Sequence, residues 1–160
     1  MPKSTSMKAA GVVFGAAAVS ALMASPAQAD EAAGPIHFSS GNFQCAIDDN
    51  GVVGCDVTGG DQMTIDLGGS ADFPVPFRVD QVVADVDWAP AHPGFNPGAY
   101  TLEGGNPNIS DVGYPVGEGA TRGSEVSHAG SRCWTGFHGS FQCETAAGHG
   151  FFHYIGIQAH

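Results

Sequence analysis

Two cysteine pairs with the same spacing constrain the fold of this chain more than any other feature. Nine residues separate the members of each pair, and in both stretches a glycine stands six positions after the first cysteine. Four cysteines allow three disulfide pairings, and sequence alone normally does not choose between them. The repeated spacing helps here, because it fits two β-hairpins. The pairs are Cys45 with Cys55 and Cys133 with Cys143.

A hairpin with a three-residue loop explains this spacing. Glycine at the third loop position, Gly51 or Gly139, supplies the left-handed backbone that such a turn requires. Counting back from the loop sets the two cysteines of a pair opposite each other at a non-hydrogen-bonded site, where α-carbons approach to about 4.5 Å. A disulfide can span that distance, so the sequence predicts local pairing. The same count sets Trp134 opposite Gln142.

Metal and redox roles for cysteine and histidine lack the expected spacing. No Cys-x-x-Cys and no close cluster of cysteine and histidine occurs, so neither zinc binding nor redox catalysis is indicated. His149 and His153 are four apart in a stretch typical of a strand, which places them about 13 Å from each other. They cannot share one zinc ion without a bend. We expect no metal and no cofactor.

Residues 1–29 are typical of a signal peptide. Lys3 and Lys8 precede an apolar stretch over 9–24, and Ala27-Gln28-Ala29 supplies the small-x-small pattern of a cleavage site. The apolar stretch is shorter than the roughly 20 residues that a bilayer core requires. The sequence therefore predicts a secreted, extracellular protein with a single domain over 30–160 and no membrane insertion after signal cleavage.

The predicted mature chain is strongly acidic. Three arginines stand against all 16 acidic residues, a net charge of −13. Nucleic acid and anionic membrane surfaces are therefore poor partners. We expect the partner to be an extracellular protein or a glycan.

Short alternating segments between turn residues indicate an all-β fold. Glycine and proline, 24 and 10 residues of the whole chain, interrupt nearly every stretch long enough for three helical turns. The pattern favours an antiparallel sandwich or barrel with two disulfide-stapled hairpins. The expected strands cover residues 37–47, 52–57, 62–67, 75–86, 99–102, 132–135, 140–145 and 150–157.

The segment 88–130 stands apart as a long, irregular, loop-rich excursion. It is rich in proline and glycine and poor in apolar residues. Long loops inside compact domains are usually functional or mobile, and aromatic side chains within them can stack on sugars or on a partner protein. The sequence predicts a contact surface here. The alternative is that these aromatic side chains simply pack against the sheet. Its aromatic residues are Trp88, Phe95, Tyr100 and Tyr114.

Catalytic patterns are weak throughout. Asp85 and Asp87 straddle Val86 and would share one face of a strand, an arrangement that glycoside chemistry can use, although surface solvation is the commoner reason. No Gly-x-Ser-x-Gly occurs. The run 48–51 lacks the alternating ligands of a calcium loop. We expect no catalytic residue.

Two segments resemble a known family. Residues 38–45 read FSSGNFQC and residues 143–151 read CETAAGHGF. They are similar to the Ser-Gly-Asn-x-x-Cys opening and the Cys…Gly-His-Gly-Phe closing of small secreted actinobacterial proteins of unknown function. The chain departs from that family in lacking a proline before Ser-Gly-Asn and in its long middle segment. The resemblance implies an exported, disulfide-bearing β domain and no catalytic residues.

Three functions fit these observations. The leading hypothesis is a secreted, non-enzymatic β domain that binds an extracellular protein or an envelope glycan through the 88–130 segment. The first alternative is an exported hydrolase acting on cell-wall polymer, with Asp85, Asp87 or a histidine as acid or base. The second is a structural envelope protein without a discrete site.

Overall fold

A computed structural model describes residues 34–69 and 72–160. The predicted signal peptide, 1–29, lies outside these residues. No helix in the described part of the chain is long and apolar enough to cross a membrane.

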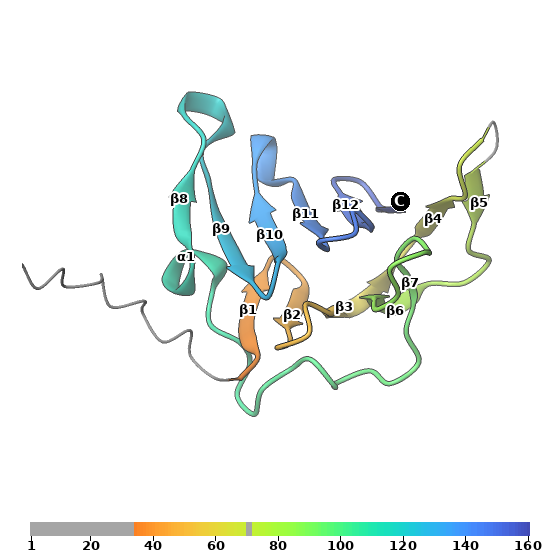
Figure 1. Cartoon of the computed structure of the whole chain (residues 1–160), viewed down its shortest axis with the longest axis horizontal. Helices are drawn as coiled ribbons and strands as arrows, with labels where there is room; N and C mark the ends of the chain where they lie inside the picture. The colour runs from red at the N-terminus through yellow and green to blue at the C-terminus, as the bar shows by residue number, and fades with distance from the viewer. Residues whose placement is uncertain (1–33, 70–71) are drawn as a thin grey trace, which may run out of the picture. The chain divides into compact units, whose positions relative to one another are not determined.

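The fold is all-β and contains two sheets, as Figure 1 shows. The five-stranded sheet has the order β1-β2-β3-β6-β7, and the eight-stranded sheet has the order β5-β4-β13-β12-β11-β10-β9-β8. The strands of the first sheet are β1 (Ile36–Ser40), β2 (Phe43–Ile47), β3 (Val53–Asp61), β6 (Val79–Ala84) and β7 (His92–Pro93). The strands of the second are β4 (Met63–Asp66), β5 (Asp72–Pro74), β8 (Tyr114–Val116), β9 (Gly123–His128), β10 (Ser131–Thr135), β11 (Phe141–Glu144), β12 (Gly150–His153) and β13 (Ile157–Ala159). Three short helical turns complete the described part: α1 (Ile109–Val112), η1 (Gly119–Thr121) and η2 (Phe137–Gly139).

Both predicted hairpins are confirmed, with the predicted register. Cys45 lies opposite Cys55 and Cys133 lies opposite Cys143, and each pair forms a disulfide with α-carbons 4.0 Å apart. The loop glycines have the left-handed backbone that the turns require, with φ of 79° at Gly51 and 77° at Gly139. Two disulfides fit an oxidising compartment.

The chain passes from one sheet to the other at Gln62. β3 ends at Asp61 in the five-stranded sheet, and β4 begins at Met63 in the eight-stranded sheet. The bend uses two left-handed glycines, Gly59 and Gly60, where the register of β3 against β6 shifts. β13 then pairs with β4 in parallel. At this corner the chain therefore continues from one sheet directly into the other.

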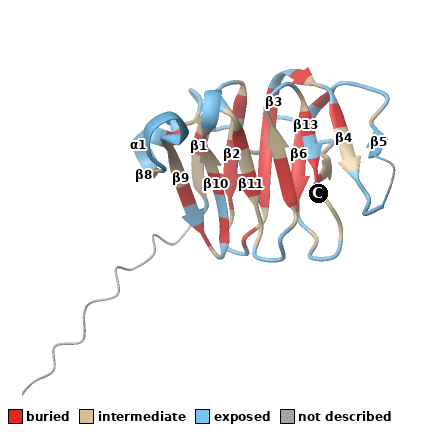
Figure 2. Ribbon diagram, turned by 90° about the horizontal axis from the view of Figure 1, so that it is seen from above, coloured by how far each residue is buried: buried red, intermediate tan, exposed pale blue. Residues whose placement is uncertain are grey.

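The core lies between the sheets and is centred on phenylalanines from both. The Phe43 ring lies 5.2 Å from that of Phe141 and 5.9 Å from that of Phe151, and the rings of Phe38 and Phe141 are 6.4 Å apart. Both disulfides are buried in the same cluster. Figure 2 shows buried residues running along β2, β3 and β6, whereas α1 and β8 at one edge are largely exposed. Two sheets sharing one core form a sandwich.

The segment 88–130 is irregular only in its first half. Residues 94–108 contain no strand, and the strand expected over 99–102 is absent. The second half departs from the expectation, because β8 and β9 are regular strands of the eight-stranded sheet. Of β9 only Val126 and His128 are buried. Because β9 has a single apolar residue on its buried face, its sequence does not show the alternation of apolar and polar residues that would predict a strand.

Candidate functional site

A buried carboxylate holds residues 94–108, here called the strap, against the outer face of the five-stranded sheet. Asp56 on β3 is 7% exposed. It accepts hydrogen bonds from the Gly98 amide at 2.8 Å, the Tyr100 amide at 2.9 Å and the Thr101 hydroxyl at 2.7 Å. The side-chain amide of Gln81 on β6 donates a fourth at 2.8 Å. Three strap donors thus converge on one carboxylate.

Two amide side chains complete the attachment of the strap. Gln81 donates to the Asn96 carbonyl at 2.6 Å and accepts from the Asn96 amide at 3.1 Å. Asn106 donates from Nδ2 to the carbonyls of Phe38 and Cys45 at 3.1 and 2.9 Å. The polar groups on this face are thus paired within the fold, and the strap covers them.

Tyr100 packs on a glycine of the same face. A Cβ at Gly54 would overlap the Tyr100 ring, so only glycine leaves room for it. Burial raises the pKa of Tyr100, and the charges of Asp85, Asp56 and Asp48 raise it further. The ring is half-buried and belongs to the packing of the strap.

The outer face of the eight-stranded sheet is different, because one row of aromatic and polar side chains crosses it from strand to strand. Successive members lie directly opposite each other in the register of the sheet. Every member except Tyr114 has at least one chain neighbour buried in the core, so those members face outward, and Tyr114 is itself 49% exposed. All members are half-buried or exposed. This aromatic–polar row consists of Tyr114 (β8), Glu125 (β9), Trp134 (β10), Gln142 (β11), Phe152 (β12), Gln158 (β13) and Thr64 (β4).

Hydrogen bonds fix the β8 end of the row. The Tyr114 hydroxyl donates to Glu125 Oε1 at 2.6 Å, and the Ser127 hydroxyl donates to the same oxygen at 3.0 Å. The two hydroxyl oxygens are themselves 3.0 Å apart. Tyr114 is still 49% exposed, so its hydroxyl is held in place while much of the residue remains in contact with solvent.

An ion pair orders the middle of the row. The Arg132 guanidinium lies 4.5 Å from the centre of the Trp134 ring, and Arg132 also pairs with Glu144 at 3.0 Å. A cation over an indole ring is favourable and restricts its orientation. Arg132, Trp134, Glu125 and Phe137 line one hollow of this face. The row thus carries an oriented indole beside a charged donor.

Two further hollows lie at the other end of the row. Thr64, Phe152 and Gln158 line both of them, and Tyr154 and Ile155 line one of the two. Two of the aromatic members of the row, Trp134 and Phe152, therefore each border a hollow.

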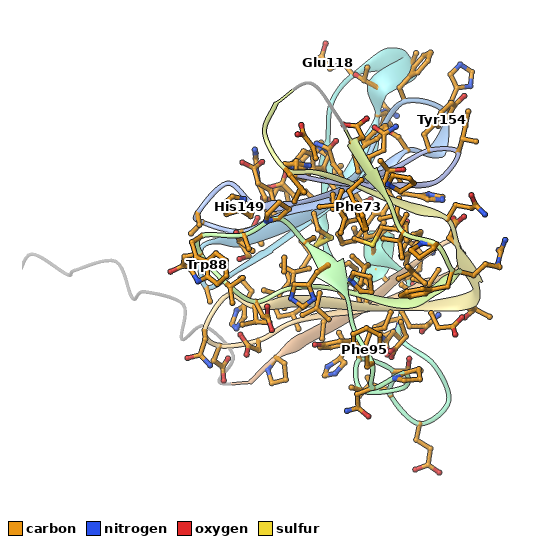
Figure 3. All side chains as sticks on the ribbon, turned by 90° about the vertical axis from the view of Figure 1, so that its right-hand side faces the viewer. Phe73, Trp88, Phe95, Glu118, His149 and Tyr154 are labelled. Atoms are coloured by element: carbon orange, nitrogen blue, oxygen red, sulfur yellow. A yellow bond between two sulfur atoms is a disulfide. The ribbon has the colours of Figure 1, made fainter. Side chains whose placement is uncertain are left out.

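The four aromatic residues predicted as a contact surface do not lie together. Trp88 and Phe95 are 83% and 84% exposed, and Figure 3 shows them on different parts of the molecule. Trp88 lines a hollow with Leu67, Pro90 and His149, and Figure 3 places it on the same side as His149. Tyr100 belongs to the strap and packs on Gly54, and Tyr114 begins the row on the other sheet.

Three histidine–aspartate pairs occur, each with a nitrogen–oxygen distance of 2.9 Å. They are His92 with Asp85, His128 with Asp49 and His153 with Asp61. Within residues 34–69 and 72–160, no group of three or more histidine, cysteine, aspartate or glutamate side chains could hold a metal ion. The second and third pairs join residues 79 and 92 positions apart in the chain.

The expectation that Asp85 and Asp87 share one face of a strand is wrong. β6 ends at Ala84, and both residues lie in the loop that follows. They line a small hollow with Asn50 and Ser131 at one end of the sandwich. Asp85 in that hollow is already bonded to His92.

Sequence reasoning did not single out most of the row. The hairpin count placed Trp134 opposite Gln142, and alternation from the buried cysteines beside them would have turned both outward. Glu125, Phe152, Gln158 and Thr64 carry no comparable signal. Their strands are brought beside this hairpin only by the order of the eight-stranded sheet.

The predicted relationship to small secreted actinobacterial proteins stays a prediction. Its two segments meet in the core, since Phe43 of the first stacks on Phe151 of the second. Comparison of the chain with protein families, with curated proteins and with solved structures finds no match.

Proposed function

We propose that this protein is an exported, non-enzymatic binding module that holds a glycan on the open face of the eight-stranded sheet. The observation that carries the proposal is the aromatic–polar row, in which rings alternate with amide, carboxylate and hydroxyl groups across the sheet. The other outer face has its polar groups paired beneath the strap.

The chemistry of the row suits sugars. Aromatic rings present flat apolar surfaces on which the C–H face of a pyranose can stack, and amide and carboxylate groups bond its hydroxyls. A small number of placed polar groups among apolar ones is typical of ligand-binding surfaces. Trp134 and Phe152 supply the surfaces, and Gln142 between them can donate and accept.

Export is proposed with this function. The 1–29 segment, two buried disulfides and a mature net charge of −13 suit a protein outside the cell. Intact mass of the protein released by a bacterial host should correspond to a chain that begins at Asp30 and lacks four thiol hydrogens. A retained N-terminus or free thiols would contradict export.

Binding is tested by sedimentation with insoluble chitin and cellulose. The double variant Trp134→Ala/Phe152→Ala should lose at least tenfold in affinity, because both stacking surfaces are removed. The matched control is Trp88→Ala/Phe95→Ala. It removes two aromatic rings that lie outside the row, and it should bind like the wild type. Thermal unfolding of all three proteins shows that each is folded.

The remaining outcomes separate the alternatives. Loss of binding in the Trp88/Phe95 variant alone would move the contact surface to the 88–130 segment. Release of reducing sugar from either polymer, abolished by Asp85→Asn/Asp87→Asn, would favour the hydrolase. Absence of binding by the wild type to both polymers would overturn the glycan proposal.

A further inference from the structure

We infer that the ligand of the open face is a neutral, extended β-1,4-linked glycan that runs across the strands, with one disaccharide unit for each aromatic ring of the row. This inference rests on the function proposed above and adds the linkage, the charge and the direction of the ligand. It is carried by the spacing of the rings, by the residues between them and by the charge of the row.

The rings stand on every second strand. Tyr114 is on β8, Trp134 on β10 and Phe152 on β12, and β9 and β11 lie between them. Neighbouring strands are about 4.8 Å apart, so the backbone positions that carry successive rings are about 10 Å apart. In an extended β-1,4-linked chain each sugar is turned over relative to the last, and the same face returns with every disaccharide. That repeat is close in length to two strand spacings.

The strands between the rings carry hydrogen-bonding groups. Glu125 lies on β9, Gln142 on β11 and Gln158 on β13. An amide both donates and accepts, and a carboxylate accepts. A chain laid across the strands therefore places a sugar over a ring and the next sugar over a polar group, in the alternating order that the turned-over units of the glycan present.

A path along the strands does not give this alternation. On β10 the outward residues are Arg132 and Trp134, and the residue between them, Cys133, is buried in the core. A ligand following that strand meets a single aromatic ring. Only the path across the strands meets all three rings, so the register of the sheet favours that direction.

The charge of this face favours a neutral ligand. In the row only Glu125 is charged, and its Oε1 already accepts two hydrogen bonds. The arginine that lines a hollow of the row, Arg132, is paired with Glu144. Among the described residues that form the row, a polyanionic glycan would meet no lysine or arginine, and it would be repelled by a mature chain of net charge −13.

The experiment is calorimetric titration of the wild-type protein with oligosaccharides of two, four and six sugars. Cello-oligosaccharides and chito-oligosaccharides share the β-1,4 linkage and differ in the acetamido group, so the two series distinguish the sources. In at least one series we expect affinity to rise about five- to tenfold with each added disaccharide, and to level off beyond six sugars. Malto-oligosaccharides, which have the α-1,4 linkage, should show no such steps.

Single-residue variants assign each gain in affinity to a particular aromatic ring. Tyr114→Ala removes the terminal ring, so the hexasaccharide should bind about as the tetrasaccharide does and the disaccharide should be unaffected. Trp134→Ala removes the middle ring and should cancel the gain from longer chains. Phe95→Ala, an exposed ring under neither path, is the matched control. Thermal unfolding identifies any variant that is not folded, and the wild-type length series does not depend on the variants.

The outcomes separate this inference from the proposed function. Binding of polymer without a length step, or equal affinity for the malto-oligosaccharides, would overturn the inference and leave a glycan-binding face. Tight binding of a polyanionic glycan would do the same. Absence of binding to any oligosaccharide or polymer would remove both. Stepwise affinity lost in Trp134→Ala and retained in Phe95→Ala would support both.

Discussion

The two outer faces of this sandwich meet solvent in opposite ways. On the five-stranded sheet, Asp56 and Gln81 are buried under the strap and satisfied by its backbone. On the eight-stranded sheet, Trp134 and Phe152 are half-buried, and their polar neighbours contact other side chains or solvent. A buried polar group must find a partner within the fold. The covered face therefore contributes to stability, and the open face is the one on which we propose binding.

This difference also accounts for the positions of the aromatic side chains in the structure. The irregular segment draws attention in the sequence because of its prolines and rings, yet one of those rings, Tyr100, fills the space above Gly54. Exposed rings elsewhere in it, Trp88 and Phe95, are isolated from each other. The ordered set of rings lies instead on regular strands, where the register of the sheet spaces them.

Among the variants that test the difference between the two faces, Asp56→Ala should have the largest effect on stability. The Gly98 amide, the Tyr100 amide and the Thr101 hydroxyl lose their acceptor, so we expect the free energy of unfolding to fall by about 3 kcal/mol and hydrogen exchange over 94–108 to rise. Chemical denaturation and exchange mass spectrometry measure both. Asp87→Asn, an exposed carboxylate in a loop, is the control and should change stability by less than about 0.5 kcal/mol. Slow exchange of the strap in Asp56→Ala would show that other contacts hold it.

A smaller effect is expected from Gly54→Ala. The added methyl group overlaps the Tyr100 ring, so we expect a loss of about 2 kcal/mol from overpacking. In a Tyr100→Ala background the ring that the new methyl group would overlap is gone, so Gly54→Ala should be nearly neutral. A double-mutant cycle measures this coupling between the two positions. Equal costs of Gly54→Ala with and without the ring would show that the glycine is needed for another reason.

The smallest effect is a pH dependence at the edge of the covered face. Partial burial lowers the pKa of His92, but its hydrogen bond to the Pro93 carbonyl and the hydrogen bond and charge of Asp85 outweigh this, and the net pKa is raised. A raised pKa contributes stability below the unfolded-state value and loses it as pH rises through the folded-state value. His92→Gln should therefore cost more stability at about pH 5 than at about pH 8. His37→Gln is the control, and a pH-independent cost of His92→Gln would contradict the assignment.

Much of the fold could be predicted because it is local. A three-residue loop closed by Gly51 or Gly139 determines which residues face each other, and this alone places both disulfides. The alternation of β10 and β11 follows from the same count. β9 could not be predicted, because it buries a single apolar residue, Val126, and a histidine.

The candidate site was predictable only in part. Trp134 and Gln142 are opposite each other within one hairpin, so their pairing is a property of about ten residues. Phe152 and Thr64 reach the same row through β12 and the parallel pair of β13 with β4. Pairings of this kind depend on segments far apart in the chain, and no local pattern encodes them.

By itself the sequence determined the all-β class, the two stapled hairpins with their register, and the acidic charge of the chain. These follow from residues that interact over short separations or from composition. Only the tertiary structure decided which outer face the irregular segment covers and which side chains form one row across the other. Those outcomes depend on the order of strands in each sheet, and that order is set by the burial of a shared core.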